Sequence, residues 1–522
     1  MSENLRSGAR VARGATYMFI QGFIASIIGV LYIIMVTRTF ENNPTELDIY
    51  AILSLIFAAA QIFGTFALSS ASTKYIAQYI AEGKPEKAKS IVSRILQISL
   101  ITCIVAFIAV SLSATFLSSS LLSSQTYASL FYFLAVASVL NILYMQVTAF
   151  VQGSQRILEL AIVTSIFTIL QNVIGIGLLS IGFGLWGIVI GWIIALLLSV
   201  LFALAYTGKF IGISRNFHPL RPLIRFSFPL YLSNILTFLV GWIDQIIILF
   251  ILRTQLGSYH IAVRASVVPN LVSLSIITVL FPKLSELYAQ NGIKSLRGPF
   301  RASTRYASLI GFPMIIGLGA LAYPIMILFA PTLKDAAWPL TILCLSMLPS
   351  TLGAAIVPTL LTQERIRVVS LIAVISVIFE AVISFFLLIP LGMAGAAWSR
   401  VVASLLSFIL GVFALRKSLG IPFDKEALWK SSVSSILMVL GIVTLDVARQ
   451  HITYGTIHFD QIFFGFSLRF LPVYIIVGAM TYFVSLIALK AIKKHDVDLL
   501  RDYLPKGFKW IAEWLGRIGH IK

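Results

Sequence analysis

The chain has 522 residues, of which 59% are hydrophobic and 11% charged, and its formal net charge is +19. Soluble domains carry about 25% charged residues, because they must cover their cores with polar groups. The composition therefore excludes a water-soluble globular protein and predicts a polytopic membrane protein.

A membrane-spanning helix needs roughly 20 apolar residues, and fourteen stretches of the chain meet that requirement. They are too long and too continuously apolar for barrel strands, which alternate over about ten residues. We therefore expect an all-α membrane protein with about 14 transmembrane helices. The predicted spans are 14–38, 48–72, 92–117, 127–151, 157–181, 184–208, 226–252, 257–281, 304–330, 336–361, 368–390, 392–415, 429–448 and 467–489.

The first span, the two cysteines and the C-terminal tail each add to the predicted membrane architecture. The first stretch is too long for a signal-peptide core, so we expect it to stay attached as the first membrane helix. Cys103 and Cys344 fall inside predicted helices and are expected to be free buried thiols, which leaves no disulfide framework. Residues 505–522 place Phe508 and Trp514 on one helical face beside basic residues, which indicates an interfacial helix or, alternatively, a solvated tail.

The basic residues are distributed unevenly along the chain. Of the 39 Lys and Arg residues, 32 precede the first span, follow the last, or lie in alternate connections and the first turns of the spans that follow them. Basic residues gather on the cytoplasmic side of membrane proteins. The pattern predicts a multi-pass protein of the cell membrane with both termini in the cytoplasm, and it explains the positive charge by topology and lipid headgroups rather than by nucleic acid.

The sequence repeats itself at an interval of 208 or 209 residues. An internal repeat of this length predicts two copies of one six-helix unit, and because six is even both copies begin in the cytoplasm. Parallel repeats of this kind are one architecture for alternating access. The matched pairs are Tyr50 with Tyr259, Lys74 with Lys283, Gly83 with Gly292, Gly184 with Gly392 and Gly187 with Gly395.

The repeat defines the expected domains. We predict an N-lobe of residues 1–208 and a C-lobe of residues 226–416, joined by a cytoplasmic linker of residues 209–225. Two further helices follow within residues 417–492, and residues 493–522 form a cytoplasmic amphipathic tail.

Four charged residues lie deep inside predicted spans: Asp244, Arg264, Glu380 and Arg400. Each costs about 2.5–3.5 kcal/mol at the centre of a helix, so each needs a reason. Both C-lobe hairpins carry an acid and an arginine roughly 10–15 Å below the outer boundary, within pairing distance along the membrane normal. The pairs either lower the cost of insertion or serve transport. In the second case the arginines bind an anionic substrate and the acids exchange protons or sodium ions.

The first repeat lacks these charges, because Leu55, Asn172 and Trp192 stand where the second repeat has Arg264, Glu380 and Arg400. Polar amides remain as candidates for substrate binding or for bonds between helices: Gln21, Gln61, Asn234 and Asn270. Lys74 and Lys283 end equivalent helices, where they either bind a headgroup on entry or anchor the helix ends.

Most enzyme signatures are absent from the sequence. There is no phosphate-binding loop, no metal-ligand spacing among the six histidines and no nucleophile elbow, so no cofactor, metal or catalytic residue is predicted. One acid-x-acid element, Glu46-Leu47-Asp48, is of the kind membrane glycosyltransferases use to bind a metal. No outer loop is long enough to hold an acceptor, so acidic residues on the outer side are the simpler explanation.

Several segments together resemble the polysaccharide-transport, Wzx-like branch of the multidrug/oligosaccharidyl-lipid/polysaccharide exporter superfamily. They are the first-helix segment FIASIIGVLYIIMVTRTF, Tyr50, the loop ASTKYIAQYIAEGKPEKAKSI and the motifs GFGLWG and PLGMAG. The resemblance covers essentially the whole chain and implies two six-helix lobes. It also implies that a polyprenyl-(di)phosphate-linked oligosaccharide is flipped to the outer leaflet, with arginines of a central cavity binding the phosphate. Arg264 is the best positional match and Arg400 a weaker one.

The resemblance implies a flippase rather than an enzyme, acting in cell-surface polysaccharide or glycoprotein assembly. Its partners would be the lipid-linked oligosaccharide, membrane lipids, a coupling proton or sodium ion at Asp244 or Glu380, and enzymes of glycan assembly. A lipid II flippase shares this mechanism. A multidrug/cation antiporter and a membrane glycosyltransferase are the remaining alternatives.

Overall fold

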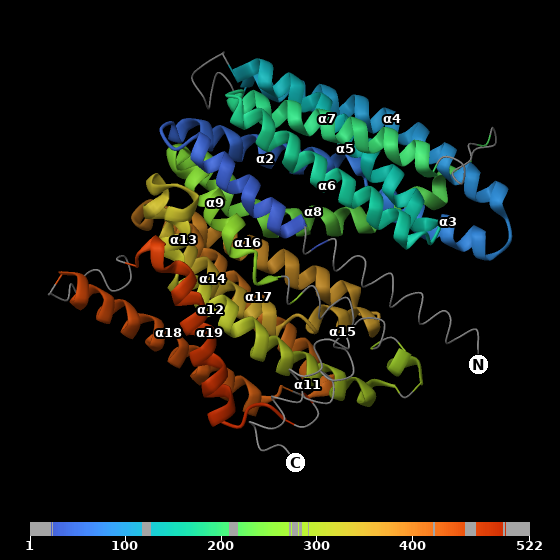
Figure 1. Cartoon of the computed structure of the whole chain (residues 1–522). Helices are drawn as coiled ribbons and strands as arrows, with labels where there is room; N and C mark the ends of the chain where they lie inside the picture. Colours follow the sequence, from blue (N-terminus) through green and yellow to red (C-terminus); the bar gives the residue numbers. More distant parts are fainter. Residues whose placement is uncertain are drawn as a thin grey trace. The chain divides into compact units, whose positions relative to one another are not determined.

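A computed structural model describes residues 22, 25–116, 127–207, 214, 218–270, 273, 280, 284, 286–290, 292–420, 423–454, 466–493 and 496. Every regular element in these ranges is a helix (Figure 1). The prediction of an all-α protein is therefore confirmed.

The chain divides into two compact units. Unit 1 comprises residues up to Trp242 together with Leu252–Ser258, and unit 2 comprises Ile243–Ile251 together with the residues from Tyr259 onward. One long helix contributes to both units, because the division falls inside it.

Unit 1 is built mainly from long helices that pack side by side. In this unit α4 packs against α5, α6 against α7, and α5 also against α7 (Figure 1). Its helices are Ala25–Thr39, α2 (Pro44–Thr65), α3 (Leu68–Ala81), α4 (Pro85–Phe116), α5 (Ala128–Gly153), α6 (Ile157–Ser180), α7 (Gly184–Thr207) and most of α8 (Leu220–Ile251), followed by η3 (Arg253–Gln255).

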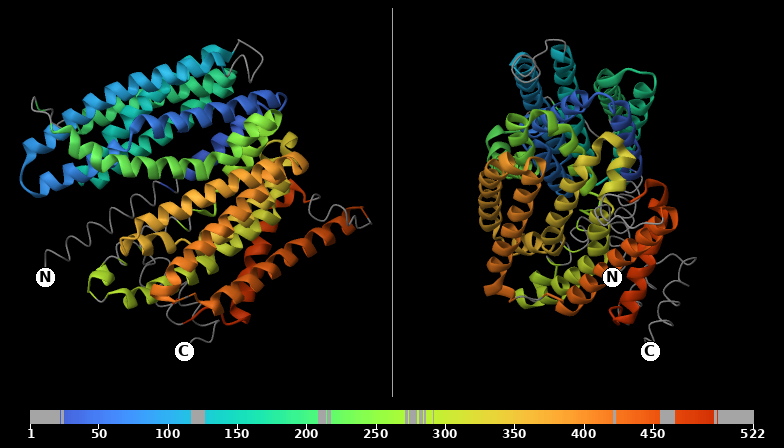
Figure 2. Two further views of the ribbon diagram at one scale, coloured as in Figure 1. Left: turned by 180° about the vertical axis from the view of Figure 1, so that it is seen from behind. Right: turned by 90° about the vertical axis from the view of Figure 1, so that its left-hand side faces the viewer.

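Unit 2 begins in the last turns of α8 and contains the later helices. Here α16 and α17 lie side by side, α17 packs on α14, and α18 packs on α19 (Figure 2). The elements are α9 (Leu256–Ser266), η4 (Ile293–Leu296), α11 (Arg297–Tyr306), η5 (Ala307–Gly311), α12 (Phe312–Ala320), α13 (Ala322–Phe329), η6 (Pro331–Ala336), α14 (Ala337–Leu352), α15 (Ile356–Thr362), α16 (Ile366–Leu391), α17 (Met393–Leu419), α18 (Lys425–Tyr454), η8 (Leu468–Phe470) and α19 (Leu471–Ala488).

Among the described residues, 11 helices are long and apolar enough to cross a membrane, and one bent pair brings the number of candidate spans to as many as 12. They correspond to twelve of the predicted spans, so the chain is a multi-pass membrane protein. The other two, 14–38 and 257–281, lie partly outside the described residues. The count of fourteen therefore stays a prediction.

Three spans that hydropathy predicts as continuous are broken. Between α2 and α3, Phe66 and Ala67 take φ values of 48° and 53°, which non-glycine residues rarely adopt. The chain turns by 68° between α12 and α13, and α14 ends before α15 begins. Hydropathy reports that a segment prefers lipid, but it does not report backbone dihedral angles, so these breaks were not predictable from it.

The backbone supports the internal repeat. Gly83 and Gly292 have φ values of 69° and 68°, and Gly184 and Gly392 have 54° and 58°. Gln155 and Glu364, also 209 residues apart, have 58° and 59°. These pairs all lie where helices end, in the left-handed region that favours glycine. The turns that shape the two units are therefore built alike.

The helix neighbours agree as well. The contacts of α4 with α5, α6 with α7 and α5 with α7 in unit 1 correspond to those of α12 with α14, α16 with α17 and α14 with α17 in unit 2. Each repeat thus folds with the same order of adjacent helices, as the sequence offset predicts.

Gly395 allows the closest approach in the α16–α17 hairpin. A Cβ atom there would lie 2.0 Å from the Leu387 carbonyl oxygen. We expect Gly395→Ala to destabilise the protein by about 1–3 kcal/mol, because backbone atoms must separate to admit the methyl group. Thermal unfolding of the purified protein in detergent measures the effect. Gly177→Ala is the matched control, since no atom lies within 4 Å of its Cβ position, and equal melting of the two variants would contradict the prediction.

Candidate functional site

A cluster of charged side chains is buried in unit 2 where α8, α9, α16 and α17 contribute to it. Its members are Asp244, Tyr259, Glu380 and Arg400, which we call the Arg400 cluster. Asp244 and Tyr259 are fully buried, and Glu380 is only 3% exposed. Charges at such sites are stable only when they are paired and hydrogen-bonded.

Asp244 is the best-satisfied member of the Arg400 cluster. Its carboxylate accepts hydrogen bonds from Arg400 Nη2 at 2.8 Å, from the Tyr259 hydroxyl at 2.5 Å and from the Gln245 backbone N–H at 2.8 Å. Three donors, one of them cationic, stabilise the ionised carboxylate. Asp244 therefore serves as the counter-ion that holds Arg400 in place.

Glu380 is less well satisfied. Arg400 Nε lies 3.5 Å from its Oε1 atom, which is longer than a charge-assisted hydrogen bond. Oε1 is buried and has no hydrogen-bond partner among the residues that the structure describes. Of the two carboxylate contacts described for this guanidinium, the one with Asp244 is the closer.

The expected pairing within each hairpin is half wrong. Glu380 does face Arg400, but Asp244 pairs with Arg400 instead of Arg264. The sequence gives the depth of a residue along its helix, whereas the direction in which its side chain points depends on how the helices pack. The two acids are thereby brought to the same arginine.

Arg264 has a different environment. It is exposed, and no carboxylate of the described residues lies within ion-pair distance. Its Nε approaches His260 Nε2 at 3.4 Å, while His260 Nδ1 lies 2.7 Å from the Gln245 side-chain oxygen. Since that oxygen can only accept, Nδ1 carries the proton and Nε2 is left to face Arg264. Two buried residues, His260 and Gln245, thus orient an arginine whose charge remains available.

The equivalent positions in unit 1 carry no such cluster. Asn172 and Trp192, which match Glu380 and Arg400, are buried, and the Trp192 indole nitrogen has no hydrogen-bond partner among the described residues. The repeat therefore supplies the same scaffold twice, while the charged site is present only in the second copy.

The polar amides predicted as candidates are distributed over both units. Gln61 accepts a hydrogen bond from Asn141 at 3.4 Å inside unit 1, which fits a bond between helices. Asn234 and Asn270 are half-buried. Gln21 lies outside the described residues, so nothing is added to that prediction.

The two lysines predicted at helix ends are only partly described. Lys74 is exposed, and its Nζ lies over the Phe226 ring at 4.0 Å from the centroid and over the Tyr75 ring at 4.9 Å. These cation–π contacts hold the ammonium group against two aromatic rings. Lys74 lies in the middle of α3 rather than at a helix end, because the break at Phe66 and Ala67 starts a new helix before it. Lys283 lies outside the described residues.

The acid-x-acid element has a packing role. Asp48 is 8% exposed and its Oδ1 accepts a hydrogen bond from the Gly257 N–H at 2.6 Å. A Cβ atom on Gly257 would lie 2.5 Å from the Leu47 carbonyl carbon. Asp48 therefore closes a tight contact between the start of α2 and the start of α9. Among the described residues, no group of three or more metal-ligating side chains is found there or elsewhere.

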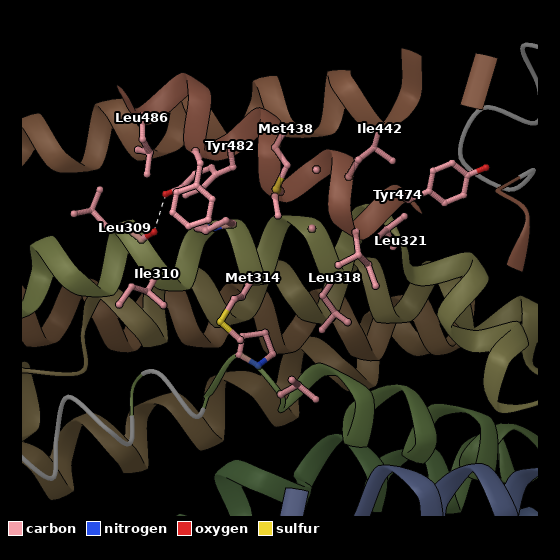
Figure 3. Close-up of a pocket in the computed structure, with 18 of the residues that line it drawn as sticks. Leu309, Ile310, Met314, Leu318, Leu321, Met438, Ile442, Tyr474, Tyr482 and Leu486 are labelled. Carbon is pink, nitrogen blue, oxygen red and sulfur yellow. Dashed lines mark hydrogen bonds between the residues drawn. The ribbon is translucent and has the colours of Figure 1, made fainter. Parts of the chain in front are cut away.

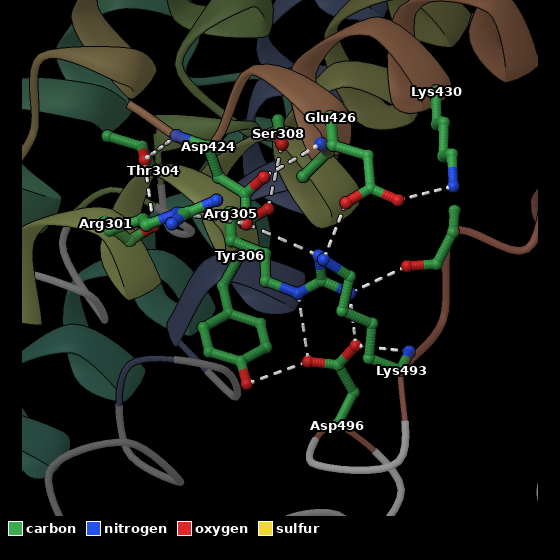
Figure 4. A network of polar contacts seen from close by, with 12 residues as sticks. Arg301, Thr304, Arg305, Tyr306, Ser308, Asp424, Glu426, Lys430, Lys493 and Asp496 are labelled. Carbon is green, nitrogen blue, oxygen red and sulfur yellow. Dashed lines mark hydrogen bonds and ion pairs between the residues drawn. The ribbon is translucent and has the colours of Figure 1, made fainter. Parts of the chain in front are cut away.

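Sequence reasoning missed a second polar network, centred on Arg305 of α11 (Figure 4). The Arg305 guanidinium pairs with Asp424 and Asp496 and donates to the Ala491 carbonyl at 2.7 Å. Burial raises the pKa of Asp496, but Arg305 and the Lys493 N–H outweigh it and hold that pKa below its usual value. The network ties the segments flanking α18 and α19 to α11. Asp424 and Asp496 lie far apart in the sequence, so no local spacing could have revealed it.

An apolar cavity of about 920 Å³ lies between α12, α18 and α19 (Figure 3). Leu318, Met438 and Tyr482 are among its lining residues, and Tyr306 and Asp496 add polar groups to the lining. The Tyr482 hydroxyl donates to the Leu309 carbonyl at 2.7 Å, inside the π-helical turn η5. Such turns leave a carbonyl without its usual helical partner, and here a side chain supplies the bond.

Comparison with known proteins gives two relatives that are named as transport proteins. Over 446 residues the chain is 23% identical to the probable low-salt glycan biosynthesis flippase Agl15 of Haloferax volcanii, covering 83% of this chain and 90% of that protein. It is also 30% identical over 175 residues to the succinoglycan biosynthesis transport protein ExoT of Rhizobium meliloti, covering 33% of this chain and 34% of that protein. These names are those of transport proteins rather than enzymes.

Two solved structures share the fold. The lipid II flippase MurJ in an inward closed conformation matches with a TM-score of 0.69 and 16% identity, covering 90% of this chain and 97% of that chain. An inward-facing multidrug resistance transporter of the MATE family matches with a TM-score of 0.64 and 16% identity. The match covers 76% of this chain and 96% of that chain. The polysaccharide biosynthesis protein family matches residues 43–331, more than half of the chain. The chain therefore belongs to the family of polysaccharide biosynthesis proteins.

Proposed function

We propose that the protein is a flippase that moves a polyprenyl-(di)phosphate-linked oligosaccharide from the cytoplasmic to the outer leaflet by alternating access. The observation that carries the proposal is Arg264 on α9, an exposed arginine within the predicted span 257–281 that has no carboxylate partner among the described residues. Membership of the polysaccharide biosynthesis family and the flippase names of its relatives give the substrate class.

The chemistry of Arg264 fits a phosphate ligand. A guanidinium donates two parallel hydrogen bonds to phosphate oxygens and stays charged at any physiological pH. Within the membrane, an arginine without a counter-ion costs free energy unless a ligand or water accepts its hydrogen bonds. In our proposal the lipid-linked phosphate is that ligand. The further roles predicted for Arg400, the polar amides and the two lysines stay proposals.

The proposed topology follows the basic residues. Both termini lie in the cytoplasm, and the protein resides in the cell membrane. Residues 1–208 and 226–416 form the two lobes, joined by the linker 209–225, and 417–492 add two helices before the tail 493–522. The equivalent turns at Gly83 and Gly292 support two lobes of one architecture.

The relatives also decide between the alternative functions. A lipid II flippase is favoured only by the shared fold with MurJ, whereas the family and both named relatives concern other glycans. The multidrug antiporter rests on the same kind of likeness. We therefore place the oligosaccharide flippase first.

Reconstitution into proteoliposomes tests the proposed function. A fluorescent polyprenyl-diphosphate oligosaccharide is added to the outer and inner leaflets, and a membrane-impermeant quencher reports which leaflet it occupies. We expect protein-dependent exchange between leaflets. Failure to flip any of several lipid-linked sugars, combined with cation-driven dye efflux, would overturn the proposal in favour of an antiporter.

The apolar cavity beside α18 and α19 suits the isoprenoid chain of such a substrate, because its lining is almost entirely hydrocarbon. We expect Met314→Trp, which fills part of the cavity, to slow the flipping of a long-chain substrate several-fold. A short-chain analogue should be flipped at an unchanged rate. Leu345→Trp is the control, since Leu345 is exposed to a similar degree, 39% against 37%, and does not line the cavity. Equal slowing of both substrates would contradict this role for the cavity.

A further inference from the structure

Three positively charged side chains of unit 1 have no carboxylate partner. Lys74 of α3 and Arg221 and Arg225 of α8 are exposed, and none of them forms an ion pair with a carboxylate of the described residues. Two acids that follow α3, Glu82 and Glu86, are each paired with another lysine. The described part of the chain therefore leaves these three charges uncompensated.

An aromatic contact brings the three cations together. The Lys74 ammonium lies over the Phe226 ring, 4.0 Å from its centroid. Phe226 directly follows Arg225, and Arg221 lies one turn earlier on α8. Tyr75, next to Lys74, packs edge-on against Phe226 with the ring centroids 5.7 Å apart. The contact between α3 and α8 thus gathers the cations near one aromatic side chain.

Hydrogen bonds fix the start of α8 on α3 and α4. The buried His218 precedes α8, and Arg94 Nε of α4 donates to its carbonyl oxygen at 2.8 Å. His218 Nδ1 lies 3.0 Å from the Pro219 carbonyl oxygen, and Nε2 lies 3.1 Å from the Tyr79 hydroxyl of α3. Because a carbonyl only accepts, Nδ1 carries the proton and Nε2 accepts from Tyr79. A site held in this way loses little freedom when a ligand binds.

An exposed apolar row runs along α8 beside the two arginines. Its members recur every four residues, so they lie on one face of the helix, and they are between 40% and 49% exposed. Arg221 and Arg225 each directly follow one of the first two members. The row consists of Leu220, Ile224, Phe228 and Leu232.

The cations and the apolar row lie at different depths. Arg221 and Arg225 precede the predicted span 226–252, whereas Phe228 and Leu232 lie inside it, roughly 3–9 Å from its start at a rise of 1.5 Å per residue. Positive charge at the boundary is thus followed by exposed hydrocarbon within the span. A phospholipid has the complementary order, with its phosphate at the boundary and its acyl chains below.

We propose that the junction of α3 and α8 binds an anionic phospholipid, whose phosphate is held by Lys74, Arg221 and Arg225. Its acyl chain lies along the inner half of the apolar row. Ammonium and guanidinium groups donate charge-assisted hydrogen bonds to phosphate oxygens. A zwitterionic headgroup fits less well, because the unpaired side chains around the site are all cations. In the proposed topology the site lies in the cytoplasmic leaflet, where anionic lipids gather near basic residues, but lipid binding does not depend on the flippase function.

Native mass spectrometry of the purified full-length protein measures the binding of added phosphatidylglycerol. Each cation near an anionic lipid contributes roughly a factor of five to binding. We therefore expect Arg221→Ala/Arg225→Ala to bind phosphatidylglycerol about twentyfold more weakly than the unaltered protein. Arg221→Lys/Arg225→Lys should recover most of the affinity, because it keeps both charges. Phosphatidylcholine should bind weakly to all three proteins.

The matched control removes two exposed arginines from unit 2. Arg367→Ala/Arg416→Ala changes the net charge by the same amount and should bind phosphatidylglycerol as the unaltered protein does. Equal weakening in the two double alanine variants would mean that net charge alone attracts the lipid, and the proposal would be wrong.

Competition separates a phospholipid from other phosphate ligands. Inorganic phosphate should leave phosphatidylglycerol bound, because it makes no contact with the apolar row. A polyprenyl-diphosphate oligosaccharide at equal concentration should also leave it bound, because the proposed substrate site is at Arg264, and Arg264→Ala should retain the phospholipid. Displacement by inorganic phosphate would reveal a simple anion site. Displacement by the lipid-linked diphosphate would assign the junction to the substrate headgroup that Lys74 is predicted to bind on entry. Either result would overturn the proposal without bearing on flipping itself.

Photolabelling locates the lipid on the unaltered chain. Phosphatidylglycerol with a diazirine in its acyl chain is irradiated in nanodiscs, and peptide mass spectrometry maps the labelled residues. We expect labelling around Phe228 and Leu232 that falls several-fold in Arg221→Ala/Arg225→Ala. The exposed Phe386 of α16 should be labelled equally in both proteins. Labelling of α8 that does not respond to loss of the arginines would contradict a headgroup site at this junction.

Discussion

Replacement of Arg264 by alanine is expected to reduce flipping of a lipid-linked diphosphate oligosaccharide by roughly a hundredfold. Hydrogen bonds from a charged donor contribute about 1.5–3 kcal/mol each, so the loss of a bidentate contact removes about 3 kcal/mol or more, and each 1.4 kcal/mol is a factor of ten. The fluorescent proteoliposome assay measures the rate. The flipping rate of Arg264→Lys should lie between those of the unaltered protein and Arg264→Ala, because lysine keeps the positive charge but lacks the planar guanidinium that donates two parallel hydrogen bonds.

The same substitution should leave the fold intact. Arg264 is exposed and bonds to no carboxylate of the described residues, so Arg264→Ala should melt within a few degrees of the unaltered protein. Arg367→Ala, which removes an exposed arginine from the first turn of α16, is the matched control and should flip normally. Normal flipping by Arg264→Ala, or equal loss in both variants, would contradict a phosphate site at this position.

Replacement of Arg400 by leucine is expected to cause a large loss of stability, whereas Arg264→Ala is expected to leave the fold intact. Removing one partner of a buried ion pair typically costs about 3–5 kcal/mol, because the other charge is left uncompensated. Here two carboxylates lose their guanidinium, and the Asp244 and Glu380 side chains are both nearly inaccessible to water. Thermal unfolding in detergent and the yield of folded protein measure the effect.

A rescue variant distinguishes charge from packing in this second prediction. Replacing Arg400 by leucine together with Asp244→Asn and Glu380→Gln removes every charge of the Arg400 cluster. The cost of breaking a buried ion pair comes from the uncompensated charge that is left. No such charge is left in the triple variant, so much of the stability should return. If Arg400→Leu alone melts like the unaltered protein, the cluster does not stabilise the fold.

The amino-acid sequence by itself determined the features that depend on local composition. Long apolar stretches such as 184–208 became membrane helices because hydrocarbon excludes unpaired backbone groups. The repeat placed Gly184 and Gly392 at equivalent turns, where both have a positive φ. The depths of Glu380 and Arg400 were close enough for them to face each other. Each of these properties is encoded within about one helix length of sequence.

Only the tertiary structure decided which charges meet. Asp244 pairs with Arg400, 156 residues away, and Arg305 joins Asp424 and Asp496, because helix rotation and packing bring these side chains together. Sequence fixes the height of a residue along a helix but not the neighbour that its side chain faces. The free charge of Arg264 is a consequence of that packing. With Asp244 bonded to Arg400, no carboxylate among the described residues pairs with Arg264. The difference between the paired Arg400 and Arg264, which we propose to bind the substrate, therefore arises only in three dimensions.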